Sequence, residues 1–332
     1  MTMEKRSRLE RAIAGDIVDR IPVALWRHWP GDDQRAADFA QALVRFQQYF
    51  DWDFVVVQPS HNFSVVGYGL QDIWQGTLNG QRDIMRRVIS RSLDWTELRP
   101  LTPERGDIGK QVECLRLLNQ AFTPENIPFV QVIYSPLAQA ERLAGRDLLL
   151  QHMRTQADRL RTGLNAITET TLRFIETLRH SGIAGILYIT EQASYEILTE
   201  KEYKTFGLPY DSKILDSIPS AWWFNMIQVN GRAPMLHLFA DANVQVLNWS
   251  DQEARPPLDR APVEFRGALC GGLGENKHLH LATPAVIRNV GREAMSLMGR
   301  RHLILGCGTA IPITAPLSNL QAARDIVRIS AG

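Results

Sequence analysis

Short runs of apolar, β-branched and aromatic residues recur along the chain, and each run ends in residues that favour turns. Such runs predict β-strands. The sequence contains eight of them, at residues 21–26, 54–58, 129–134, 185–190, 224–229, 244–248, 265–270 and 302–306. Amphipathic stretches with helical spacing lie between them, notably at residues 36–50, 148–179, 200–218 and 284–298.

The alternation of these strands and helices predicts an α/β protein, a single (β/α)8 TIM barrel that spans residues 1–332. A doubly wound sheet is the rival arrangement, but no glycine-rich nucleotide-binding fingerprint follows the first strand. The stretch 69–126 is polar, rich in arginine and irregular, so we interpret it as an insertion in the second β/α connection. Such an insertion would serve as a lid or as an interface.

The 332 residues are 45% hydrophobic and carry a net charge of +1, with acidic and basic residues interspersed. This balance produces no field that would attract nucleic acid or an anionic membrane, so neither is expected as a partner. The three cysteines, Cys114, Cys270 and Cys307, are widely spaced, which predicts free thiols in a reducing compartment. The first residues lack the apolar core of a signal peptide, so we expect a cytoplasmic protein.

Polar residues end most of the predicted strands, and a barrel would bring them together at one mouth, where barrel enzymes keep their active sites. Arg27 is a candidate carboxylate ligand, because a guanidinium recognises a carboxylate through two parallel hydrogen bonds. His61, Glu191 and Cys307 are the candidate catalytic residues, with His61 and Glu191 moving protons. The substrate-binding candidates besides Arg27 are His28, Ser60, Asn62, Tyr134, Gln192, Gln228, Asn230, Asn248, Asp251 and Cys270.

Each of these candidates also has a purely structural interpretation. Arg27 would pair with Asp32 or Asp33 in a loop, and Glu191 would cap the helix that follows it. Cys307 lies between two glycines, where a thiol either meets a ligand or fills a small buried space. Both interpretations stay open on the sequence alone.

Several short segments resemble, in their order and spacing, the uroporphyrinogen decarboxylase superfamily, and the resemblance runs over nearly the whole chain. They lie at residues 20–27, 53–60, 206–215, 246–251, 271–272, 283–284, 306–308 and 316–320. The superfamily includes tetrapyrrole decarboxylases and corrinoid-linked methyltransferases. The resemblance implies a barrel like those of uroporphyrinogen decarboxylase and cobalamin-independent methionine synthase, and a homodimer.

The decarboxylase type within this superfamily implies two arginines near the first strand, an aspartate after the second and a histidine after the last. Only Arg27 is kept, because Gly31 stands where the second arginine is expected and Cys307 replaces the histidine. The second strand ends without a carboxylate, at residues 58–62. Uroporphyrinogen itself is therefore not the expected substrate.

The methyltransferase type implies a zinc site made of His-x-Cys at the fifth strand and a cysteine at the eighth. Cys307 fits the last ligand, whereas Gln228 and Asn230 occupy the other two positions. Carboxamides are poor zinc ligands, so no cofactor is favoured. If zinc is bound at all, Cys307, Cys270 and Gln228 are its expected ligands.

These observations lead to an expected function and two alternatives. The expectation is a carbon–carbon lyase that uses metal-free, decarboxylase-like acid/base chemistry on a small or tetrapyrrole-like carboxylate. The first alternative is a methyltransferase that works with a corrinoid partner protein or a thiol acceptor. The second is a barrel that binds a ligand without catalysis. Bound zinc would favour the first alternative.

Overall fold

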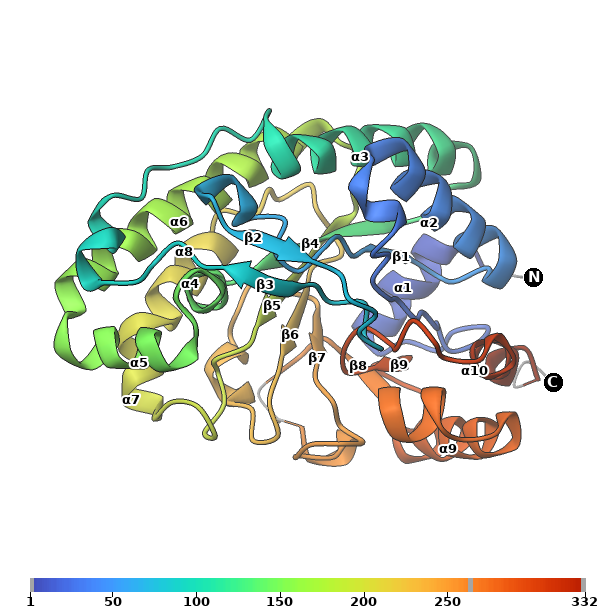
Figure 1. Ribbon diagram of the computed structural model, residues 1–332. Coiled ribbons are helices and arrows are strands. Elements are labelled where there is room, and N and C mark those ends of the chain that lie inside the picture. The colour runs from blue at the N-terminus through green and yellow to red at the C-terminus, as the bar shows by residue number, and fades with distance from the viewer. Residues whose placement is uncertain (1–2, 262–264, 330–332) are drawn as a thin grey trace.

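The computed structural model describes residues 3–261 and 265–329, and its centre is a curled, fully parallel sheet (Figure 1). Its seven strands are ordered β1-β4-β5-β6-β7-β8-β9. They are β1 (Val55–Val57), β4 (Phe129–Tyr134), β5 (Gly185–Thr190), β6 (Met226–Val229), β7 (Val246–Asn248), β8 (Ala268–Leu273) and β9 (Leu303–Cys307). Every residue of these strands is buried, which fits a parallel sheet covered on both faces. Seven of the eight predicted strands are thus confirmed, β4 and β5 with the predicted ends and the other five with shifted ends.

The predicted first strand, 21–26, is reduced to an isolated parallel bridge between Val23 and Leu305. The amide of Ala24 donates to the carbonyl of Leu305 at 3.2 Å, and the Leu305 amide donates to the Pro22 carbonyl at 2.8 Å. On its other side, the carbonyl of Val23 accepts from the amide of Asp53 at 3.0 Å. Pro22 has no N–H to add to the ladder, which helps to keep this pairing short.

The helices flank the sheet in the order that the sequence pattern predicts (Figure 1). They are α1 (Lys5–Ala14), α2 (Ala36–Phe50), α3 (Gly106–Phe122), α4 (Pro136–Ala144), α5 (Arg146–Thr155), α6 (Ala157–Thr177), α7 (Glu200–Phe206), α8 (Leu208–Leu215), α9 (Pro284–Leu297) and α10 (Leu317–Ile329).

Two of the long predicted helices are each divided in two. The predicted helix 148–179 is α5 and α6, because Gln156 between them leaves helical geometry, with φ −139° and ψ 43°. The predicted helix 200–218 is α7 and α8, separated at Gly207. Pro209 lies in the first turn of α8, a position where its missing N–H costs no helical hydrogen bond. No helix in the described residues is both long and apolar enough to cross a bilayer.

The stretch 69–126 is more ordered than predicted. It contains the antiparallel hairpin of β2 (Gln71–Ile73) and β3 (Asp83–Arg86), followed by α3, which packs on α2. The hairpin lies in front of the sheet in Figure 1. Whether this stretch acts as a lid or as an interface stays a prediction, as do the expected homodimer and the cytoplasmic location.

A buried ionic network lies on the amino side of β1. The carboxylate of Asp53 is fully buried and accepts from Arg8 Nη1 at 2.7 Å and from Arg20 Nη1 at 2.7 Å. It also accepts from the amide of Val23 at 2.8 Å. The Arg8 guanidinium is held further by Asp19. This network therefore ties α1 and the segment 21–26 to the start of β1.

Candidate active site at the carboxyl ends of the strands

Buried polar atoms without hydrogen-bond partners gather just beyond the carboxyl ends of the strands. Proteins normally pair nearly all buried polar groups, so such a gathering is typical of a site that receives a ligand. The atoms concerned are Gln58 Oε1, His61 Nδ1, Arg142 Nε and Nη1, Gln192 Oε1, Gln228 Oε1, Asn248 Oδ1 and Glu275 Oε2. Six of these seven residues are more than nine-tenths buried, with His61 the exception.

A cleft of about 360 Å³ opens between the strand ends and the β2–β3 hairpin. Its volume is within the range of small-molecule sites, about 300–1,000 Å³. Two of the predicted catalytic residues, His61 and Glu191, lie in its wall, although no hydrogen bond joins them. The hairpin supplies Gln81 and Ile84, and the remaining lining residues are Arg87, Glu141, Arg142 and Arg146.

Arg142, on α4, is the best-positioned cation of this cleft. Its side chain is 6% exposed, and Nη2 donates to Glu191 Oε1 at 2.8 Å. The guanidinium carbon lies 4.1 Å from the centre of the Tyr134 ring, a favourable cation–π contact. The Tyr134 hydroxyl is fixed in turn by Gln58 Nε2, which donates to it at 2.8 Å. Two of the three guanidinium nitrogens, Nε and Nη1, have no acceptor.

The two histidines of the mouth are uncharged near neutral pH. Burial lowers the pKa of His28 to about 4, against the partial offset of its hydrogen bond to the Pro59 carbonyl at 3.0 Å. Burial, and then the positive charge of Arg142, hold the pKa of His61 well below its ordinary value. A histidine with such a pKa is a weak base. The proton-transfer role of His61 stays a prediction that this environment does not favour.

The centre of the mouth is neutral. Gln228 Nε2 donates to Asn230 Oδ1 at 2.7 Å and to Thr309 Oγ1 at 3.4 Å. Asn248 Nδ2 donates to the carbonyls of Cys270 at 2.8 Å and Cys307 at 2.9 Å. Asn248 therefore joins the ends of β7, β8 and β9, which are parts of the chain about twenty to sixty residues apart.

The residues at this centre do not fit a zinc ion. Burial raises the pKa of both thiols, Cys270 and Cys307, so each is protonated, and Cys307 Sγ donates to the Thr309 carbonyl at 2.9 Å. Zinc binds thiolate sulfur and imidazole, whereas Gln228 offers a carboxamide. Across residues 3–261 and 265–329, no three His, Cys, Asp or Glu side chains are grouped as a metal site requires.

Arg27 lies apart from the other predicted residues. It lines a separate cavity, with Trp29 and Phe46, between α2 and the start of α10. Its guanidinium carbon is 4.2 Å from the Trp29 ring centre, and Nη1 donates to the Ile313 carbonyl at 3.2 Å. The expected pairing of Arg27 with Asp32 or Asp33 is not formed as an ion pair, although the charge of Asp32 acts on the pKa of Arg27. The structure thus separates Arg27 from His61 and Glu191.

Three further predicted residues have local structural partners. Asp251 accepts from the Gly272 amide at 2.9 Å, Gln192 donates to Glu141 at 3.0 Å, and Asn62 donates to Asp72 of β2 at 2.6 Å. The last contact attaches the hairpin to the turn after β1.

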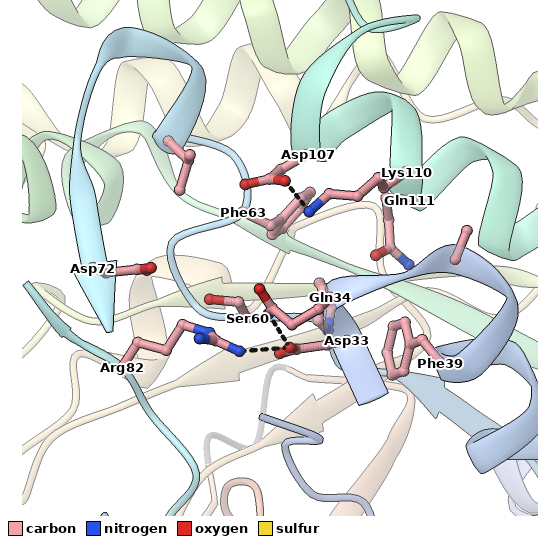
Figure 2. A pocket seen from close by; sticks show the side chains of 13 residues that line it. Asp33, Gln34, Phe39, Ser60, Phe63, Asp72, Arg82, Asp107, Lys110 and Gln111 are labelled. Carbon is pink, nitrogen blue, oxygen red and sulfur yellow. Dashed lines mark hydrogen bonds and ion pairs between the residues drawn. The ribbon is translucent and has the colours of Figure 1, made fainter. Parts of the chain in front are cut away.

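Ser60 belongs to a second small cavity beneath the hairpin, drawn in Figure 2. Four of its five charged residues form ion pairs with one another, and the fifth, Asp72, accepts from Asn62. Arg82 of the hairpin donates to Asp33 at 2.8 Å, and Lys110 of α3 pairs with Asp107. Figure 2 shows both pairs across the cavity, with Ser60 between them. The arrangement anchors the hairpin to the short 3₁₀ helix Asp32–Gln34, so we interpret this cavity as structural.

The sequence-based selection missed Arg142 and Glu275. Arg142 is the one cation in the buried, mainly apolar helix Pro136–Ala144, and an arginine in such a setting needs partners, which is a signal readable from sequence. Glu275 begins a π-helical segment, Glu275–His280, directly after β8. Its Oε1 accepts from Ser250 at 2.6 Å, its Oε2 has no partner, and burial raises its pKa.

Similarity to known proteins bears on the kind of chemistry. The chain is 22% identical over 337 residues to "Methylcobamide:CoM methyltransferase MtbA" of Methanosarcina acetivorans, and the match covers 95% of both chains. The protein of the same name from Methanosarcina mazei is 21% identical over 336 residues, again with 95% of both covered.

Two solved structures resemble the fold. A methyltransferase from Methanosarcina mazei has a TM-score of 0.84 at 19% identity and covers 97% of this chain and 98% of its own. A B12-independent methionine synthase from Shewanella sp. W3-18-1 has a TM-score of 0.56 at 12% identity, with 97% and 98% covered. The expected likeness to the fold of the methionine synthase is therefore found. The expected eight-stranded barrel is not confirmed, because the parallel sheet of the described residues has seven strands.

These relatives overturn the expected reaction. The lyase with decarboxylase-like chemistry on a carboxylate or tetrapyrrole-like substrate is wrong as the main expectation, because the proteins similar over the whole length are named as methyltransferases. The residues agree, since the decarboxylase type's second arginine, strand-end aspartate and final histidine are all absent from the sequence. The methyltransferase alternative fits better. The family model for uroporphyrinogen decarboxylase (URO-D) matches residues 72–329, which is more than half of the sequence, and the chain therefore belongs to that family.

Proposed function

We propose that this protein is a methyltransferase that moves a methyl group from a methylated corrinoid to a small acceptor. The observation that carries the proposal is the similarity, over 95% of both chains, to proteins named for methyl transfer from a methylcobamide to CoM. The cleft and the unpartnered polar atoms at the strand ends support a site for the acceptor. We also propose that the segment 21–26 completes the barrel around this mouth.

The transfer needs a nucleophilic acceptor atom. A bond forms between that atom and the methyl carbon, the cobalt–carbon bond breaks with its electron pair left on the corrinoid, and the acceptor gives up a proton. Glu275 is the residue proposed to take it. Its Oε2 is buried and unpartnered, and Cys307 lies near enough for the Glu275 charge to raise its pKa. A raised carboxyl pKa makes a better base near neutral pH.

We propose that this methyl transfer does not depend on zinc. Gln228 and Asn230 bond to each other. Burial raises the pKa of Cys307 and keeps it a neutral thiol, which donates to the Thr309 carbonyl. This donor set would have to break its own hydrogen bonds and lose a proton to bind a metal that prefers other ligands. Deprotonation of the acceptor by a carboxylate replaces metal activation in this proposal.

The hairpin offers a surface for the corrinoid partner protein. Four of its large apolar side chains are exposed: Ile73 at 49%, Trp74 at 38%, Leu78 at 58% and Met85 at 63%. Exposed apolar groups gathered on one small element are typical of interaction sites. The same hairpin lines the cleft through Gln81 and Ile84, so a partner seated on it would reach the mouth.

The test is a methyl-transfer assay with free methylcobalamin and a panel of acceptors that includes CoM, other thiols and amines. The expected result is demethylation of methylcobalamin, followed by its visible spectrum, in the presence of at least one acceptor. Arg154→Gln is a control variant that should keep the activity, because Arg154 on α5 is exposed and pairs with Glu202. Absence of demethylation with every acceptor, by a folded protein, contradicts the proposal.

Zinc dependence is tested separately by elemental analysis after dialysis. We expect the purified protein to contain far less than one zinc per chain and its activity to survive a chelator. The double variant Gln228→His and Asn230→Cys should gain zinc, because it supplies two ligands beside Cys307. Stoichiometric zinc in the unaltered protein that is lost in Cys307→Ser would overturn metal independence.

A further inference from the structure

Four fully buried polar side chains form one hydrogen-bonded chain between β5 and the helices α7 and α8. Tyr188 and Thr190 are two residues apart on β5, so their side chains point to the same face of the sheet. The Tyr188 hydroxyl donates to Asp211 Oδ1 at 2.6 Å, and the Tyr203 hydroxyl donates to Asp211 Oδ2. The Tyr203 hydroxyl oxygen also lies 2.8 Å from Thr190 Oγ1. The chain thus joins Asp211 of α8 to the end of β5.

Asp211 is a buried carboxyl group that, among the described residues, has no ion-pair partner. Burial raises its pKa to about 6, against the partial offset of the two hydrogen bonds from the tyrosines. Arg161 of α6, the helix that packs on α8, pairs instead with Asp158. His237, which precedes β7, bonds to Glu200. A single proton can therefore neutralise Asp211 slightly below neutral pH.

The two tyrosines keep their protons over the same pH range. Burial, and then the negative charge of Asp211, hold the pKa of Tyr188 and of Tyr203 well above its ordinary value. Asp211 is therefore the group in this chain that gains or loses a proton.

The charge of Asp211 sets the direction of the hydrogen bonds. An ionised carboxylate can only accept, so both phenols donate to it. A phenol has one hydrogen, so Tyr203, which gives its hydrogen to Asp211, can only accept from Thr190. While Asp211 is ionised, the donors run from Thr190 through Tyr203 to Asp211.

A proton on Asp211 reverses this direction. On Oδ1 it would point at Tyr188, whose own hydrogen has no other acceptor among the described residues, and a buried donor without an acceptor is costly. On Oδ2 it is donated to Tyr203, whose hydrogen then turns to Thr190. The protonated chain therefore runs from Asp211 through Tyr203 to Thr190, and the Thr190 oxygen accepts where it donated before.

We propose that Asp211 is a positioning residue for the end of β5, and that the gain or loss of one proton there reverses the hydrogen-bond chain that reaches Thr190. Thr190 is the last residue of β5, and its carbonyl accepts from the Asn230 amide at 2.9 Å. The next residue, Glu191, pairs with Arg142 in the cleft. Solvent supplies the proton, and no bond between heavy atoms changes. The inference goes beyond the proposed function, because it needs neither a corrinoid nor an acceptor.

The test is an NMR titration of the Thr190 amide signal, in protein labelled with ¹⁵N-threonine, from pH 5 to pH 8. We expect the signal to titrate with a midpoint of about 6. In Asp211→Asn the amide nitrogen can stand in for the protonated oxygen and hold the chain in its reversed direction at every pH, so the signal should not titrate. A Thr190 signal that does not titrate in the unaltered protein, or that titrates equally in Asp211→Asn, overturns the inference.

Two variants that each remove one phenol form a matched pair. Tyr203→Phe breaks the connection between Asp211 and Thr190, so the titration of the Thr190 signal should disappear. Tyr188→Phe removes only a hydrogen bond that lowers the pKa of Asp211, so the titration should persist with a higher midpoint. Roles in packing alone would not distinguish the two phenols in this way. Persistence in a folded Tyr203→Phe protein, or loss in a folded Tyr188→Phe protein, contradicts the inference.

The folding equilibrium provides a second measurement. The pKa of Asp211 is about 6 in the fold against 3.8 ordinarily, so the folded chain holds this proton more tightly than the unfolded chain. The stability that results is complete below pH 3.8 and is lost as the pH rises through 6. Between pH 5 and pH 8 the folding constant of the unaltered protein should fall about tenfold further than that of Asp211→Asn. Equal falls, measured by urea denaturation, would overturn the inference.

Discussion

The Asp53 carboxylate on the amino side of the sheet differs from Arg142 and Glu275 at the carboxyl ends in how fully its polar atoms are paired. On the amino side of β1, the Asp53 carboxylate has hydrogen bonds from Arg8, Arg20 and the Val23 amide, and both of its oxygens are used. Beyond the carboxyl ends, Arg142 and Glu275 are comparably buried, yet each keeps polar atoms without a partner.

This contrast separates the residues that hold the fold from those that act on a ligand. In a buried network whose hydrogen bonds are all formed, these bonds offset the free-energy cost of desolvation, so no ligand is needed to complete it. An unsatisfied one lowers stability until a ligand supplies the missing partner. In barrel enzymes the same division is general, with stability at the amino face and chemistry at the carboxyl face. Three substitutions test this difference between the two groups of residues.

The largest effect is expected on the free energy of unfolding when Asp53, whose carboxylate oxygens are both hydrogen-bonded, is replaced. Asp53→Ala leaves Arg8 and Arg20 as buried cations without their shared carboxylate, so the free energy of unfolding should fall by about 3–5 kcal/mol. Urea denaturation measures it. The control is Asp158→Ala, since Asp158 is exposed and its pair with Arg161 contributes at most about 1 kcal/mol. Equal effects of the two substitutions would mean that the Asp53 network does not stabilise the fold.

The next effect is a pH dependence at the mouth. His28 has a pKa of about 4 in the fold against 6.5 ordinarily, so the unfolded chain takes up its proton first. The stability that His28 contributes is therefore complete above pH 6.5 and is lost as the pH falls from 6.5 towards 4, by about 3 kcal/mol in all. In His28→Gln the fall in unfolding free energy between pH 7 and pH 4 should be smaller by that amount.

The matched control for His28 is His180→Gln. His180 is exposed at the end of a short 3₁₀ helix, Leu178–His180, so its replacement removes a histidine without altering the buried mouth. A His28→Gln variant whose unfolding free energy follows pH as the unaltered protein does would show that His28 is not held neutral by burial.

The smallest of the three effects concerns Glu275, whose Oε2 has no hydrogen-bond partner. Glu275→Gln removes the proposed proton acceptor but keeps an oxygen for the Ser250 hydroxyl. The rate of methyl transfer should fall by about a hundredfold, a typical contribution of a general base. An unaltered rate in the folded variant would mean that Glu275 has no part in proton transfer.

The strands and helices were largely predictable, because their patterns are local. Apolar runs located all seven strands of the sheet, and α2 has the predicted bounds, Ala36–Phe50. The errors arose where one residue outweighed the pattern. Gln156 and Gly207 each divide a predicted helix, and the segment around Val23 pairs through a single bridge.

The site was less predictable, because its members come from distant parts of the chain. The sequence placed His61 and Glu191 at strand ends, and the structure puts both in one cleft. It could not show that Arg27 turns towards Trp29, away from that cleft, or that Arg142 enters it. Those outcomes depend on side-chain directions and on packing between elements, which periodicity does not encode.

The alternation of strands and helices, the family resemblance and the presence of the carboxamides Gln228 and Asn230 after a predicted strand could all be read from the sequence. These follow from residue type and spacing along the chain. Which polar groups have hydrogen-bond partners, and which do not, depends on the tertiary structure. Burial sets the cost of a missing hydrogen bond, and burial exists only once β4, β5 and the hairpin enclose Arg142.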